Sequence, residues 1–129
     1  MGPLYGADKD RFYGELDIFL FPTNYANEAE PLVVYEALRQ GVFVIACDRG
    51  SISEMLDHGA GLVFARDDIV ELAVINIKKL IEDRDSLAAA QDLSLRQAQR
   101  IRSASRTELD KLLARMQGVA TTENVAGLV

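Results

Sequence analysis

The sequence predicts an α/β protein: a Rossmann-like parallel sheet with flanking helices, followed by a helical C-terminal segment. Three short apolar runs, at 17–21, 42–46 and 62–64, alternate with helical patterns. Strands that alternate with helices are joined by right-handed crossovers and are therefore parallel. From Ile69 to Ile81 apolar residues recur at steps of three and four. This spacing predicts an amphipathic helix that packs on the sheet.

The first half of the chain supplies two of the expected strands. Residues 9–15 are expected to form a short helix with Asp8 as its N-cap. The run 17–21 is apolar at successive positions, which predicts a strand buried on both faces. Residues 31–40 then read as a helix, and the β-branched run 42–46 reads as a second buried strand.

The second half is expected to be mainly helical after one more strand. Ser51–Leu56 predicts a short helix in which Ser51 and Glu54 form a capping box. Two further helices are expected after the one that ends near Ile81, and Gly118 is expected to end the last of them. The expected organisation is a partial Rossmann-like domain at 1–84, C-terminal helices packing on it at 85–117, and a disordered tail at 118–129.

Composition limits the possible functions. The 129 residues suffice for one domain, and 14 Lys+Arg against 20 Asp+Glu give a net charge of −6. This balance disfavours nucleic acid as the main partner, because phosphate binding needs a basic surface. One cysteine, Cys47, and one histidine, His58, cannot form a disulfide or a His/Cys metal site. No signal pattern and no bilayer-spanning run occurs, so a cytoplasmic location is expected.

The candidate site is a helix start between two glutamates, Glu28 and Glu36. The loops 22–30 and 48–51 should leave the carboxyl ends of parallel strands, where open α/β sheets bind ligands. A helix N-terminus favours phosphate, and a carboxylate can accept hydrogen bonds from two neighbouring hydroxyls of a sugar. The stretch therefore suits a nucleotide-sugar.

Several motifs follow one another in this part of the chain. They are Asp17-Ile-Phe-Leu-Phe-Pro-Thr, Glu28-x7-Glu36-Ala-Leu-x-x-Gly-x-x-Val-Ile-Ala, Gly50-x-x-x-Glu54 and Gly59-x-Gly-Leu-Val. Over residues 4–82 this order resembles the C-terminal nucleotide-sugar-binding domain of retaining GT-B glycosyltransferases, family four, also called group 1. The chain would then be the second half of that Rossmann-like domain.

The resemblance implies a role for each matching residue. The chain would be the donor-binding part of a metal-independent, retaining hexosyltransferase that uses a UDP- or GDP-sugar and no cofactor. Glu28 would be the catalytic residue near the transferred sugar, and Glu36 would hold the ribose hydroxyls. The other candidate donor-binding residues are Glu30, which could replace Glu28, the backbone N–H groups of Leu32 and Val33, Gly50 beside the diphosphate, and Asn27 in the sugar pocket.

Two departures from the family pattern affect these expectations. Ala29-Glu30-Pro31 stands where many relatives have glycine-rich residues, and Pro31 has no N–H to donate. The N-terminal acceptor domain and its Arg/Lys pair are absent, so the sequence is expected to be a fragment that is inactive alone. Association with that domain, self-association through an incomplete sheet, and peripheral membrane contact by the arginine-rich segment 96–106 are the expected partnerships.

The sequence leaves other functions open. The chain could be a non-catalytic interaction module, or part of a sugar epimerase or phosphorylase with the same fold. Asp83-Arg84-Asp85 matches the Asp-x-Asp metal motif of another glycosyltransferase class, but it lies at a predicted helix end rather than after a strand. No metal site is therefore expected.

Overall fold

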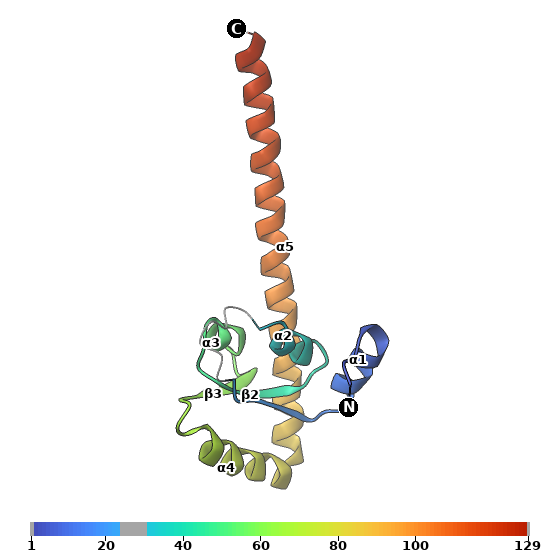
Figure 1. Ribbon diagram of the computed structural model, residues 1–129, viewed down its shortest axis with the longest axis vertical. Helices are drawn as coiled ribbons and strands as arrows, with labels where there is room; N and C mark the ends of the chain where they lie inside the picture. The colour runs from blue at the N-terminus through green and yellow to red at the C-terminus, as the bar shows by residue number, and fades with distance from the viewer. Residues whose placement is uncertain (1, 24–30, 129) are drawn as a thin grey trace. The chain divides into compact units, whose positions relative to one another are not determined.

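A computed structural model describes residues 2–23 and 31–128, with side chains described as far as Gly118 (Figure 1). The chain forms two compact units, Met1–Gln99 and Arg100–Val129. All strands belong to the first unit. The elements are, in order, α1 (Gly6–Gly14), β1 (Ile18–Phe21), α2 (Leu32–Arg39), β2 (Phe43–Cys47), α3 (Ile52–Met55), β3 (Gly61–Phe64), α4 (Ile69–Glu82) and α5 (Arg84–Leu128).

The three strands form one parallel sheet in the order β1-β2-β3. Phe21 is level with Ala46, and Cys47 is level with Phe64, so the three strands end at the same edge of the sheet. The loops that begin at Pro22 and Asp48 leave from this edge. The predicted fold class, a Rossmann-like parallel sheet with flanking helices and a helical C-terminal segment, is confirmed.

The central strand β2 is buried along its whole length. Successive side chains of a strand point to opposite faces. Phe43, Ile45 and Cys47 therefore share one face, where they form a core with Ile69 and Ala73 of α4. Helix α2 contacts β2, and Figure 1 shows α2 and α4 on opposite sides of the sheet. The thiol of Cys47 is free and buried, as the apolar surroundings predict.

The expectation that the first strand is buried on both faces is wrong for Leu20. The side chain of Leu20 in β1 is 44% exposed. In the three-stranded sheet β1 pairs only with β2, so it is an edge strand in the described part of the chain. Leu20 lines a small apolar cavity of about 120 Å³ together with Pro22 and residues of α4.

The expected helix starts need two corrections. Tyr5, not Asp8, is the N-cap of α1, and Asp8 lies in the first turn. The backbone N–H of Asp8 donates to the carbonyl oxygen of Tyr5, so the helix begins before the predicted cap. Ser51 is the N-cap of α3, but it makes no side-chain capping hydrogen bond, so the predicted capping box with Glu54 does not form.

The C-terminal segment is one helix rather than two. Helix α5 runs without interruption from Arg84 to Leu128, where two helices were expected, and it continues through Gly118. This stretch carries no proline, and a single glycine costs only about 1 kcal/mol in a helix. Up to Gln99 the helix belongs to the first unit, where Ser94 Oγ donates to the carbonyl oxygen of Ala60 at 3.0 Å. Within the described residues, no helix has the length and apolarity needed to cross a membrane.

Candidate functional site

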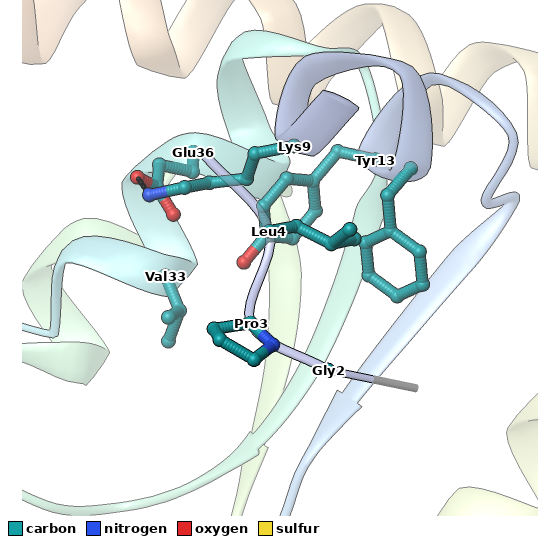
Figure 2. A pocket seen from close by; sticks show the side chains of 8 residues that line it. Gly2, Pro3, Leu4, Lys9, Tyr13, Val33 and Glu36 are labelled. Carbon is teal, nitrogen blue, oxygen red and sulfur yellow. Dashed lines mark hydrogen bonds and ion pairs between the residues drawn. The ribbon is translucent and has the colours of Figure 1, made fainter. Parts of the chain in front are cut away.

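A cavity of about 410 Å³ lies where α1, α2 and the N-terminal segment meet. Figure 2 shows its side chains, with charged groups on one side and apolar groups on the other. Glu36, the residue expected to hold the ribose hydroxyls, is among them. The lining residues are Gly2, Pro3, Leu4, Lys9, Phe12, Tyr13, Val33 and Glu36.

The charged side of the cavity is an ion pair between two helices. Lys9 Nζ of α1 donates to Glu36 Oε1 of α2 at 2.8 Å. The side chain of Glu36 is only 13% exposed, whereas that of Lys9 is 35% exposed. Figure 2 shows the ammonium group beside the two carboxylate oxygens. The contact between the largely buried carboxylate and the ammonium group is a charge-assisted hydrogen bond, which is stronger than one between neutral groups.

Tyr13 of α1 interacts electrostatically with the same carboxylate. Its ring is buried and packs edge-on against Phe12 and Phe19, with ring centroids 5.5 and 5.8 Å away. Tyr13 and Glu36 line the same cavity. The pKa of Tyr13 is raised above its ordinary value of 10.0. Burial of the side chain is the largest cause, and the negative charge and hydrogen-bonding capacity of Glu36 add to it.

This shift predicts a loss of stability at alkaline pH. Below pH 10 Tyr13 is protonated in both the folded and the unfolded chain, and its contribution is fully present. Above pH 10 the unfolded chain ionises first, so the free energy of unfolding falls until the raised folded-state pKa is passed. The Glu36→Gln variant should lower the pKa of Tyr13 without restoring 10.0, because burial remains. Ultraviolet titration of the tyrosines checks this; an unchanged titration in the variant would contradict it.

A second ion pair joins the same two helices outside the cavity. Arg39 Nη2 of α2 donates to Asp10 Oδ1 of α1 at 2.8 Å, and both side chains are 51% exposed. Neither residue lines the cavity. An exposed pair of this kind contributes little to stability, about 0–1 kcal/mol.

The start of α2 lies next to this cavity through Val33. Pro31 is the N-cap rather than the first helical residue, and Leu32 begins the helix. The carbonyl oxygen of Pro31 accepts the N–H of Val34 at 3.1 Å. The N–H groups of Leu32 and Val33 have no acceptor within the helix itself, as at every helix start. Val33 lines the cavity and the exposed Leu32 does not.

Of the other predicted site residues, the structure describes only Gly50, and Gly50 does not line this cavity. Gly50 lies in the turn after β2 with a φ of +51°, a conformation that suits glycine, and it is not among the lining residues. The same turn is fixed by Ser53 Oγ, which donates to Asp48 Oδ1 at 2.8 Å. Glu28, Glu30 and Asn27 lie outside the residues that the structure describes.

Sequence reasoning missed the two partners of Glu36. Lys9 and Tyr13 are four positions apart in α1 and therefore share one face of that helix. This spacing could have indicated that the two side chains act at the same place. However, Lys9 and Glu36 are 27 positions apart, and only the packing of α1 on α2 brings them together.

The fold agrees with what comparison with known proteins finds. Residues 2–103 match the family model described as "Glycosyl transferases group 1". The match covers most of the chain, and the chain belongs to this family. The resemblance seen in the sequence motifs is thereby confirmed at the level of the family, and it makes glycosyl transfer the chemistry to consider.

One curated relative adds detail about a similar protein. The chain is 37% identical over 82 residues to a protein of Rhizobium meliloti (strain 1021) named lipopolysaccharide core biosynthesis mannosyltransferase LpsB. The matched region covers 61% of this chain and 22% of the relative. The chain thus spans about a fifth of the length of that relative.

Proposed function

We propose that this chain is the donor-binding part of a glycosyltransferase that moves a sugar from a nucleotide-sugar to an acceptor. The observation that carries the proposal is the position of Glu36: it is mostly buried and held in a cavity at the meeting of α1 and α2. A fixed carboxylate beside open space suits a pair of neighbouring hydroxyls, such as those of a ribose. Family membership supplies the class of reaction.

The remaining geometry supports a ligand that extends from Glu36 toward the start of α2. Val33 lines the same cavity three positions before Glu36, one turn nearer the helix N-terminus. The positive end of a helix macrodipole and its unpaired N–H groups favour the phosphate oxygens of a nucleotide. In this arrangement the ribose would contact Glu36 and the diphosphate would approach Leu32 and Val33.

The finer features of the reaction belong to the same proposal. The domain would be of the C-terminal GT-B type, and transfer would proceed with retention and without a metal ion. Glu28, assisted or replaced by Glu30, would act near the transferred sugar, with Asn27 lining the sugar pocket and Gly50 near the diphosphate. The chain alone would lack an acceptor site and would not transfer sugar. A sugar of the mannose type is suggested by the relative, whose name describes a mannosyltransferase.

The Glu36→Gln variant tests the ribose assignment. Glutamine keeps the shape of the side chain but removes its charge and replaces one acceptor oxygen with a donor group. We expect UDP or GDP, whichever the wild type binds, to bind about 30-fold more weakly, because a hydrogen bond to a charged group contributes about 1.5–3 kcal/mol. Isothermal titration calorimetry on the wild type and the variant measures the difference.

The Glu82→Gln variant is the matched control. Glu82 is exposed at the end of α4 and lines neither of the cavities described above. The same chemical change there should leave the affinity as it is. If the wild type binds a nucleotide and Glu36→Gln binds it equally well, the ribose assignment is wrong. If the wild type binds none of the nucleotides, the donor-binding role itself is contradicted.

A further inference from the structure

Three features fix the position of the Glu36 side chain. Lys9 Nζ lies 2.8 Å from Glu36 Oε1, and Tyr13 lines the same cavity as Glu36, whose negative charge helps to raise the pKa of Tyr13. The third is enclosure, since only 13% of the Glu36 side chain is exposed. A glutamate in solution samples many rotamers, so a side chain held in this way is already ordered before any ligand arrives.

The supporting residues are themselves held in place. The ring of Tyr13 packs edge-on against the ring of Phe12 and against the ring of Phe19, which belongs to β1. Lys9 stands one helical turn before Tyr13 in α1, on the same face. One face of one helix therefore brings a charged donor and a neutral hydroxyl to the cavity that Glu36 lines. We call these two residues the Lys9–Tyr13 pair.

We infer that the Lys9–Tyr13 pair positions the Glu36 carboxylate for the ribose hydroxyls of a nucleotide. A carboxylate offers about four lone-pair sites on its two oxygens. Lys9 occupies one of these sites, and a hydroxyl donor such as that of Tyr13 would use one more, so acceptor capacity remains for a diol. The inference rests on the proposed function, because it assumes that Glu36 meets a ribose. It adds two residues whose effect on the ligand passes through Glu36.

The other ion pair between α1 and α2 provides a matched comparison. Arg39 and Asp10 also connect the two helices at 2.8 Å, but they are paired with each other and do not line the cavity. Breaking either pair removes one charged contact between the helices. Only the loss of Lys9 should release the carboxylate. A role limited to holding α1 against α2 would make the two losses equivalent.

The test compares a ribonucleotide with its 2′-deoxy counterpart. The probes are UDP and 2′-deoxy-UDP, and GDP and 2′-deoxy-GDP, titrated into the whole chain. We expect the wild type to prefer the ribonucleotide about tenfold, and Lys9→Met to reduce this preference to about twofold. Lys9→Arg should restore most of the preference, since a cation still faces the carboxylate. Arg39→Met should keep it fully.

Three results would overturn the inference. The first is retention of the full preference in Lys9→Met. The second is weakening of both nucleotides by the same factor in Lys9→Met, as a direct contact of Lys9 with the ligand would produce. The third is an equal loss of the preference in Arg39→Met, which would indicate a purely structural role. In each of these cases the wild type still binds, so the proposed function itself survives.

If the wild type binds no nucleotide, a measurement on the free protein tests whether the Lys9–Tyr13 pair positions Glu36. Nuclear magnetic resonance scalar couplings report the side-chain rotamers of Glu36 in the free protein. We expect one dominant rotamer in the wild type and in Arg39→Met, and averaging between rotamers in Lys9→Met. Averaging already present in the wild type would contradict the positioning role. Failure of nucleotide binding with a single Glu36 rotamer would instead contradict the proposed function and the ribose as ligand, while the ordering of Glu36 by Lys9 would stand.

Discussion

Replacing Gly61 with alanine is expected to lower the free energy of unfolding by about 3 kcal/mol. Gly61 opens β3 and is level with Val44 in the buried central strand. A Cβ atom at this position would overlap the backbone carbonyl oxygen of Val44, and it would also lie 3.1 Å from both methyl groups of Leu56. Backbone in a buried strand cannot move aside as a flexible side chain can. Chemical denaturation monitored by circular dichroism measures the loss.

The Gly14→Ala variant is the control for this prediction. Gly14 ends α1, and the nearest atom to a Cβ there is Gln40 Oε1 at 3.9 Å. Alanine at this position should be neutral or stabilising by up to about 1 kcal/mol, because it restricts the unfolded chain. Equal stability of Gly61→Ala and the wild type would show that β2 and β3 can separate at this point without cost. The pairing of these strands would then be less rigid than the close approach of Gly61 to the Val44 carbonyl oxygen indicates.

The fold was largely predictable because its signals are local. The run Val42–Ala46 is apolar at every position, and all five residues of β2 are buried. The apolar steps from Ile69 to Ile81 predicted α4 almost to its ends. The sequence did not predict correctly where an element ends when no strong stop signal follows it. Helix α5 passes through Gly118, since one glycine without a following proline does not end a helix.

Burial of the first strand illustrates a different limit. The sequence shows that residues 18–21 are apolar, but not how many neighbouring strands this strand has. Leu20 is exposed because β1 has one partner strand in the described part of the chain. Position in a sheet depends on the order of strands, and that order is a property of the whole fold.

The candidate site was predictable only in part for the same reason. Glu36 follows a helix start at a recognisable spacing, and the structure places it in a cavity. Its partners Lys9 and Tyr13 belong to another helix, so no local pattern connects them with it. The roles of Glu28, Glu30 and Asn27 stay predictions, because these residues lie outside the described part. The domain boundaries expected at 84 and 117 also stay predictions.

Replacing Ile45 with alanine is expected to lower the free energy of unfolding by about 4 kcal/mol. Ile45 is completely buried in the middle of β2, and its face of the sheet packs on Ile69 and Ala73 of α4. Removing three carbon atoms there loses the transfer free energy of burial and leaves a cavity between sheet and helix. The neighbouring strands on both sides leave β2 little freedom to move into that space.

The Ile81→Ala variant makes the same chemical change where the side chain is 59% exposed. Ile81 lies near the end of α4, and alanine is the better helix former, so the free energy of unfolding should change by less than about 0.5 kcal/mol. A cost for Ile45→Ala no greater than that of Ile81→Ala would contradict a tightly packed core on this face. Because β2 ends at the turn that leads into α3, loss of this packing should also disturb the sheet edge from which the loops proposed to bind the donor leave. Stability and nucleotide affinity should therefore fall together in Ile45→Ala, whereas Glu36→Gln should lower the affinity by a larger factor than its stability accounts for.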